Sequence, residues 1–225
     1  MSSFLTIVIP VFNDFESLQV LLERIEKIED TKFNFLIVDN GSTDPNLIDR
    51  ITEGGHNWSA VRTPQNLGFG GGILFGIHEC KTPWVGWMPG NLKIDPSDLV
   101  NFLIKVSFQP NLFIKALRVG RKPSARLKSY VSGLVQSLLL REKMMDTGGT
   151  PTICEKRFVT ALNNPPMDYV FESYVYFAAI RAELYIQRPK IHYGARLFGN
   201  SHWQNGLRAE VSLMRKIVSD ARSWR

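Results

Sequence analysis

The chain has 225 residues, of which 44% are hydrophobic, 11% aromatic and 21% charged. This ordinary globular composition excludes a disordered, collagen-like or coiled-coil chain, and the length allows one domain with a sizeable core. The charge is uneven. Residues 1–111 carry 8 basic and 13 acidic side chains (−5), whereas residues 112–225 carry 19 basic and 8 acidic ones (+11). The basic half is either a solvated face or a surface that meets phosphates.

Membrane-spanning and disulfide-stabilised classes are also excluded. Cys80 and Cys154 form neither a disulfide framework nor a metal-binding CxxC pattern. The chain does not open with a basic segment followed by an apolar run, and it has no stretch of about 18 apolar residues. These features predict a cytoplasmic protein.

Strand and helix patterns alternate through the first half of the chain. Apolar, β-branched runs predict strands over 4–10, 33–38, 60–62 and 84–88, and amphipathic spacing predicts helices over 15–28, 45–52, 69–79 and 98–106. This alternation is typical of a parallel α/β sheet, in which ligands bind at the carboxyl ends of the strands. We therefore expect Pro10–Asn13, Asp39–Ser42 and Pro89–Asn91 to converge on one crevice.

The second half is less regular. Its patterns predict a strand over 113–117, helices over 129–141 and 171–181, a short extended run over 189–193, and an amphipathic basic helix over 206–225. No repeat or low-complexity linker divides the chain, so one domain is expected.

Four short motifs occur in order along the first 100 residues. They are Ile9-Pro-Val-Phe-Asn-Asp14, Ile37-Val-Asp-Asn-Gly-Ser-Thr-Asp44, Asn66-Leu-Gly-Phe-Gly70 and Asp95-Pro96. Together they resemble the family 2 inverting glycosyltransferases of GT-A fold, which use nucleotide-activated sugars. The resemblance implies a Rossmann-like sheet with helices on both faces. It also implies a domain over 1–205, with a nucleotide-binding half (1–111) and an acceptor half (112–205), followed by the helix over 206–225.

The second half resembles, more loosely, the polyprenyl-phosphate sugar synthases of the dolichyl-phosphate mannose synthase type. The matching pieces are Arg118 with Arg121, the stretch Arg126–Ser132, Asp146, and Arg196-Leu-Phe-Gly-Asn-Ser201. This resemblance implies that Arg118, Arg121, Arg126 and Ser132 hold an acceptor phosphate. If the acceptor is instead a hydroxyl, a carboxylate must accept its proton, and Asp146 is the first candidate, with Glu172 second.

The first resemblance also assigns nucleotide-binding residues. Pro10, Val11 and Asp39 are expected to hold the base, and Gly68 and Gly71 to let the backbone approach the nucleotide sugar. Asp39 before Asn-Gly is also a common turn or cap residue, but the surrounding motif favours base binding.

The most important departure lies where the family has Asp-x-Asp, because this chain has Pro89-Gly90-Asn91. The two carboxylates that hold Mg²⁺ or Mn²⁺ are missing, and Asn91 offers a single neutral oxygen. Three outcomes are open: a metal-independent enzyme, weak metal binding through Asp95, or lost catalysis. We favour the first. Lys93 would then serve catalysis directly, with Lys115, Arg118 or Arg121 also available to stabilise the diphosphate.

The sequence thus predicts a glycosyltransferase that moves a sugar from a UDP-, GDP- or TDP-sugar to a lipid-linked, polyprenyl-phosphate or glycan acceptor. The basic C-terminal helix is expected to touch the inner membrane leaflet. The alternative is a catalytically silent protein that binds nucleotide sugars. Nucleic acid is not expected as a partner, because no recognised nucleic-acid-binding motif accompanies the basic charge.

Overall fold

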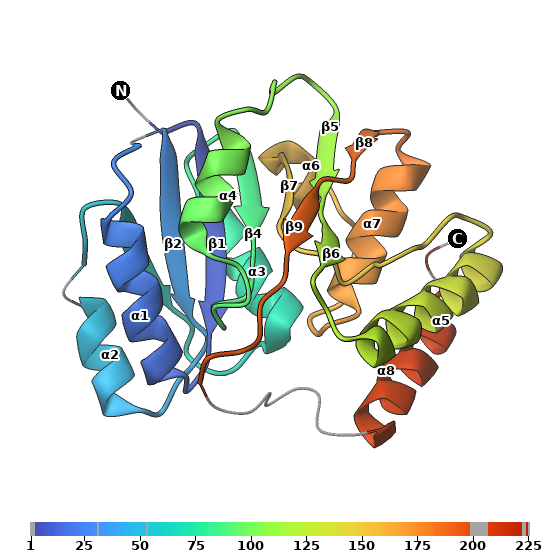
Figure 1. The fold of residues 1–225 in the computed structure, drawn as a ribbon, viewed down its shortest axis with the longest axis horizontal. Coiled ribbons are helices and arrows are strands. Elements are labelled where there is room, and N and C mark those ends of the chain that lie inside the picture. Colours follow the sequence, from blue (N-terminus) through green and yellow to red (C-terminus); the bar gives the residue numbers. More distant parts are fainter. Residues whose placement is uncertain (1–2, 31, 53, 199–206, 222–223, 225) are drawn as a thin grey trace.

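A seven-stranded sheet forms the centre of the protein in the computed structural model, which describes residues 3–30, 32–52, 54–198, 207–221 and 224 (Figure 1). In spatial order its strands are β3 (Trp58–Arg62), β2 (Phe33–Asp39), β1 (Leu5–Val11), β4 (Trp84–Trp87), β7 (Thr152–Glu155), β5 (Leu112–Lys115) and β8 (Tyr185–Gln187).

The first four strands along the chain pair in parallel, as the sequence predicts. Three helices connect them: α1 (Phe15–Glu26), α2 (Pro45–Thr52) and α3 (Gly68–Glu79). The two central strands, β1 and β2, are buried along almost their whole length. Strands buried on both faces explain the near-continuous apolar runs in the sequence.

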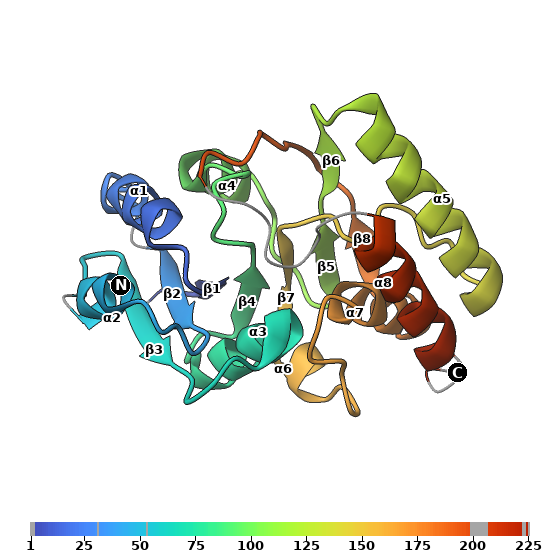
Figure 2. The same ribbon diagram turned by 90° about the horizontal axis from the view of Figure 1, so that it is seen from below.

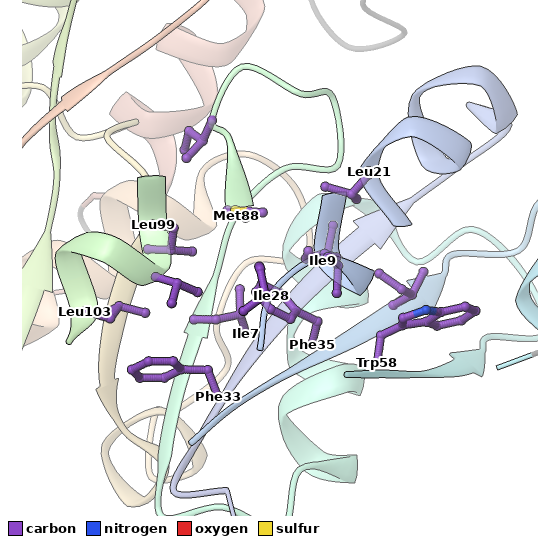
Figure 3. Packing of buried hydrophobic residues seen from close by; sticks show 14 of the residues in the cluster. Ile7, Ile9, Leu21, Ile28, Phe33, Phe35, Trp58, Met88, Leu99 and Leu103 are labelled. Carbon is purple, nitrogen blue, oxygen red and sulfur yellow. The ribbon is translucent and has the colours of Figure 1, made fainter. Parts of the chain in front are cut away.

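Helices cover both faces of the sheet, which confirms the predicted fold class (Figure 2). One face packs against α1, α2 and α4 (Pro96–Leu103), and the other against α3, α6 (Lys156–Thr160) and α7 (Phe171–Arg181). Figure 3 shows the first of these cores, where Ile7, Ile9 and Phe35 of the sheet meet Leu21 of α1 and Leu99 of α4.

The second half departs from the parallel pattern. β7 is antiparallel to both β4 and β5, and a separate parallel pair joins β6 (Leu117–Val119) to β9 (Lys190–His192). The single strand predicted over 113–117 is wrong, because Ala116 separates β5 from β6. The long helix α5 (Pro123–Leu140) begins at Pro123 rather than at Ser129, and β7, α6 and β8 were not predicted.

The C-terminal helix α8 (Leu207–Asp220) packs against α5. Of its described apolar side chains, Val218 is exposed. Ile217 and, just beyond the helix, Ala221 are buried, and the Trp224 ring contacts Tyr174 and Phe177 of α7. These side chains are therefore not available to a membrane surface. The proposed boundary at residue 205 lies outside the described residues. No helix in the described part of the chain combines the length and apolar character needed to cross a bilayer.

Candidate active site

A pocket opens at the carboxyl ends of β1, β2 and β4, and we call it the strand-edge pocket. It is lined by Pro10, Val11, Phe12, Asp14, Asn40, Phe69, Pro89, Gly90, Asn91, Tyr169 and Arg196. The loops after the strands are joined directly, since the Asn40 amide donates to the Val11 carbonyl at 2.9 Å and the Asn13 amide to Ser42 Oγ at 2.9 Å. The predicted convergence of the three loops is confirmed. Pro10, Val11 and Asn91 line the pocket, and their binding of a nucleotide sugar stays a prediction.

Asp39 ends β2 as a fully buried carboxylate and does not itself line the strand-edge pocket, although the next residue, Asn40, does. Its Oδ1 accepts the Ser42 amide at 2.8 Å. Its Oδ2 has no hydrogen-bond partner among the described residues, although Arg62 Nε lies 3.4 Å away. A buried acceptor without a hydrogen bond is costly unless a ligand donates to it, so Asp39 has the chemistry needed to receive an N–H group.

The glycine-rich start of α3 packs closely against the loop that contains Met167. Gly68 has a φ of +80°, and a Cβ there would lie 2.5 Å from the Met167 carbonyl oxygen. The Gly71 amide donates to that same carbonyl at 2.8 Å, so it is already engaged. Neither glycine lines the strand-edge pocket, whereas the intervening Phe69 does, stacked on Tyr169 at 4.5 Å. The nucleotide-binding role of the two glycines stays a prediction, and the structure adds a packing role.

The residues that replace Asp-x-Asp do not fit a divalent cation. Asn91 Oδ1 accepts the Lys93 amide at 3.3 Å. Asp95 is the N-cap of α4, where Oδ1 accepts the Ser97 amide at 2.9 Å and Oδ2 accepts Arg24 Nη1 at 2.6 Å. Among the described residues no group of three or more His, Cys, Asp or Glu side chains could hold a metal. Mg²⁺ and Mn²⁺ favour several oxygen ligands, and this donor set does not supply them.

Four basic side chains gather beside the pocket instead. Lys93 Nζ and Arg118 Cζ lie 5.9 and 5.7 Å from the centre of the same Tyr193 ring. Burial lowers the pKa of Lys93, and the charges of Arg196, Arg118 and Arg121 lower it further. Asp14 forms an ion pair with Arg196, and Asp146 forms ion pairs with Arg118 and Arg121, so two carboxylates partly offset the four positive charges. A bound anion would offset the remaining positive charge, so the cluster is suited to bind one.

A second concavity, which we call the arginine groove, lies beside β6 and the start of α5. Its volume is about 500 Å³. It is lined by Leu117, Arg118, Arg121, Pro123, Arg126, Leu127, Ser129, Tyr130, Met145 and Asp146. Three of the four predicted acceptor-binding residues, Arg118, Arg121 and Arg126, therefore line one surface. Arg121 Nε is buried there with no hydrogen-bond partner among the described residues, so this N–H group could donate to a bound anion.

Asp146 fixes the two arginines at the base of the groove. Its Oδ1 accepts Arg118 Nε at 2.9 Å and Arg121 Nη2 at 3.3 Å, and Oδ2 accepts the Arg118 amide at 3.0 Å. Burial acts to raise the pKa of Asp146, but the hydrogen bonds and charge of Arg118, with the charge of Arg121, bring it below its ordinary value of 3.8. A carboxylate held ionised in this way is a weak proton acceptor, so the geometry favours a positioning role.

Two further residues shape the groove. Ser132 does not line it and instead accepts from Gln136 Nε2 at 3.0 Å, whereas Ser129 does line it and accepts from Arg121 Nη1 at 2.9 Å. Arg188 donates through Nη1 to the Met145 carbonyl at 2.9 Å, which anchors the turn that presents Asp146. Ser129 and Ser132 belong to the same basic–serine stretch, and the sequence pattern does not distinguish between them. No local pattern in the sequence points to Arg188.

Lys115 and Glu172 do not face either concavity. Lys115 Nζ is fully buried and donates to Glu172 at 2.6 Å, to the Gly149 carbonyl at 3.1 Å and to Thr152 Oγ1 at 3.1 Å. Glu172 also accepts from Trp87 Nε1 at 2.8 Å. The predictions that Lys115 stabilises a diphosphate and that Glu172 is an alternative base are not supported, because both groups are engaged inside the core.

The parallel strand edge, its pocket and the adjoining basic groove fit the GT-A fold. Residues 6–161 match glycosyl transferase family 2, and the chain belongs to that family. Its fold is similar to that of glucosyl-3-phosphoglycerate synthase from Mycobacterium tuberculosis, solved with Mn²⁺, UDP and glucosyl-3-phosphoglycerate. The TM-score is 0.72 at 15% identity, over 99% of this chain and 80% of that one.

Two curated relatives share sequence with the chain. The undecaprenyl-phosphate 4-deoxy-4-formamido-L-arabinose transferase of Pseudomonas syringae pv. syringae is 30% identical, over 54% of this chain and 38% of its own length. The dodecaprenyl-phosphate galacturonate synthase of Rhizobium johnstonii is 25% identical, over 61% of this chain and 42% of its own length. The chain thus spans about two fifths of the length of these relatives.

Proposed function

We propose that the protein transfers a sugar, with inversion, from a nucleotide sugar to a polyprenyl phosphate at the inner face of a membrane. The observation that carries this proposal is the basic cluster that joins the two concavities. Arg196 lines the strand-edge pocket, whereas Arg118 and Arg121 line the arginine groove. The charge of each of these arginines lowers the pKa of Lys93. Donor and acceptor phosphates would meet at this cluster.

On the donor side, Asp39 would accept an N–H group of the base through Oδ2, next to Pro10 and Val11. The diphosphate would extend toward Lys93 and Arg196. As the bond between the anomeric carbon and the diphosphate breaks, its electrons pass to the leaving oxygen, and these fixed cations stabilise the charge that develops there. The charge supplied by a divalent cation elsewhere would thus come from the side chains.

On the acceptor side, a phosphate monoester would bind Arg118, Arg121 and Arg126 by charge-assisted hydrogen bonds. Such a phosphate is already ionised near neutral pH, so its oxygen can attack the anomeric carbon without a protein base. Asp146 would then keep the arginines in place rather than take a proton. The names of the two curated relatives, both polyprenyl-phosphate sugar transferases, support this choice of acceptor.

The proposal is tested by measuring release of nucleoside diphosphate by the purified chain. UDP-, GDP- and TDP-sugars are each supplied with undecaprenyl phosphate in detergent, with and without EDTA. We expect release with at least one donor, dependent on the acceptor and largely retained in EDTA. Loss of activity in EDTA that Mn²⁺ restores would overturn the metal-independent mechanism.

A second outcome favours the alternative function. The loss of both Asp-x-Asp carboxylates at Pro89-Gly90-Asn91 is the observation behind a catalytically silent protein that binds nucleotide sugars. Saturable binding of a nucleotide sugar by calorimetry, with no release under any condition, would establish that alternative and refute the transferase.

A further inference from the structure

Helix α5 has two unlike faces. Gly133, Gln136 and Leu140 are buried against the rest of the protein. On the opposite side lie five exposed apolar side chains, Leu127, Tyr130, Val131, Leu134 and Leu138, which we call the α5 stripe. Their spacing of three and four residues places them in one line along the helix. Leu138 is 80% exposed and Leu127 63%. Single exposed apolar residues are common, but a continuous line of five marks an interaction surface.

Basic side chains surround the α5 stripe. Arg126 and Lys128 each lie about 100° around the helix from Leu127, on opposite sides, at the edges of the stripe. Lys122 precedes the helix, and Arg141 and Lys143 follow it, all three exposed. Glu142, between the last two, is partly buried and forms an ion pair with Arg181 of α7 at 3.6 Å. The helix contains no acidic residue. An apolar line with a lysine and arginine border is the pattern of a helix that lies in the interface of a membrane, where the long basic side chains reach the headgroups.

The stripe is also continuous with the arginine groove. Leu127 and Tyr130 belong to both surfaces, and Arg126 borders both. A lipid phosphate bound by the arginines would have its hydrocarbon chain beside these apolar side chains, at the level where the stripe meets the bilayer.

We propose that the α5 stripe is a docking surface for an anionic lipid bilayer, and that it places the mouth of the arginine groove at the headgroup level. A second copy of the chain is disfavoured as the occupant, because pairing two stripes would bring two basic borders together without acidic residues on α5 to compensate. Anionic headgroups complement the same border. This role adds α5 to the membrane contact expected of the C-terminal helix, of which Ile217 is buried and Val218 exposed.

Co-sedimentation of the full chain with vesicles tests the proposal. Vesicles of phosphatidylcholine alone are compared with vesicles containing about one third phosphatidylglycerol. The test variant is Leu134→Gln/Leu138→Gln, which leaves the arginine groove untouched. The matched control is Ile104→Gln/Tyr185→Gln, which removes two comparably exposed apolar side chains outside α5. We expect the chain to bind the anionic vesicles, the test variant to bind about tenfold less, and the control to bind as the unchanged chain does.

Equal binding by the test variant, or no preference for anionic vesicles, would overturn the proposal. Evidence that the stripe serves dimerisation would also overturn it. That evidence would be a dimer in gel filtration that becomes a monomer in the Leu134→Gln/Leu138→Gln variant, together with no binding to vesicles. Vesicle binding needs no sugar transfer, so its failure is distinguishable from failure of the proposed transferase.

A site-specific probe removes any dependence on the folding of the glutamine variants. The two native cysteines are buried, so an environment-sensitive fluorophore on Leu138→Cys reports from the stripe, and the same label on Ile104→Cys serves as the control. We expect a blue shift on addition of anionic vesicles at position 138 only. An unchanged spectrum there, or the same shift at both positions, would refute docking through α5.

Discussion

The two halves of the molecule are built on different principles. In residues 1–111, parallel strands are held by apolar burial, as in the cluster of Ile7, Ile9 and Phe35. In the second half, strands of three or four residues meet in mixed directions, and buried polar contacts connect them. Lys115 links β5 to β7 and α7, and Arg188 links the end of β5 to the turn at Met145.

This difference matters for function as well as for folding. The acidic half supplies most of the residues that line the strand-edge pocket, while three of the four clustered cations, Arg118, Arg121 and Arg196, come from the basic half. Arg118 lies in the short strand β6, and ion pairs with Asp146 and Asp14 hold the three arginines in fixed places, which a catalytic charge cluster requires. The overall basic charge of the sequence therefore includes one localised cluster at the proposed meeting point of donor and acceptor.

The largest expected effect comes from breaking the buried polar contacts. Lys115→Met leaves Glu172 as an unpaired charge in the core, and we expect the free energy of unfolding to fall by about 3–5 kcal/mol. An apolar deletion in the first half, Ile7→Val, should cost only about 0.5–1.5 kcal/mol. Urea denaturation measures both.

The double variant Lys115→Met/Glu172→Gln sharpens this test. It removes the uncompensated charge, while the glutamine oxygen can still accept from Trp87 Nε1. We expect it to recover much of the lost stability. If Lys115→Met costs no more than Ile7→Val, the two halves do not differ in the way described.

The same contrast explains what the sequence could predict. The four parallel strands and their helices follow from local periodicity, and the predicted convergence of the loops after β1, β2 and β4 is confirmed by the strand-edge pocket. β7 was not predicted, because Thr152–Glu155 shows no distinctive alternation of apolar and polar residues. Its pairing partners, β4 and β5, precede it by many residues in the sequence. Arg188 escaped for the same reason, since its partners at Lys115 and Met145 are distant in sequence.

An intermediate effect, on the KM for the acceptor, is expected when an arginine of the arginine groove is substituted. Arg118→Lys keeps the positive charge but loses the planar guanidinium group that Asp146 holds in position. Because lysine cannot contact Asp146 and the acceptor phosphate in the same way, we expect the phosphate to lose one charge-assisted hydrogen bond, worth about 1.5–3 kcal/mol. We expect the KM for undecaprenyl phosphate to rise about 10- to 100-fold with the KM for the nucleotide sugar unchanged. Steady-state kinetics with each substrate varied in turn measures both constants.

Arg157→Lys is the control for this substitution, because Arg157 forms an ion pair with Glu155 on the surface, is largely exposed, and lines neither concavity. Its kinetic constants should match those of the unchanged chain. If Arg118→Lys raised the KM of both substrates equally, the separation into a donor pocket and an acceptor groove would be incorrect.

The smallest effect on stability, and one of opposite sign, is expected at Lys93. Burial and three neighbouring arginines lower the pKa of Lys93 below its ordinary value of 10.5, so its charge opposes folding when no anion is bound. Lys93→Met should therefore stabilise the free protein by about 0.2–1 kcal/mol while it lowers kcat. Thermal unfolding and turnover, measured on the same preparations, give the two quantities.

The pH dependence of this stabilisation follows from proton linkage. Between the lowered pKa of Lys93 in the folded protein and its higher pKa in the unfolded chain, the unfolded chain binds more protons, so the stability of the unchanged protein rises with pH in that interval. The advantage of Lys93→Met should thus be greatest at neutral pH and shrink as the pH approaches 10.5. Lys81→Met, at an exposed lysine outside both concavities, should show no such trend. If the Lys93→Met protein were less stable than the unchanged chain at neutral pH, other groups of the protein would already compensate the charge of Lys93. The positive charge of the cluster would then give no reason to expect a bound phosphate.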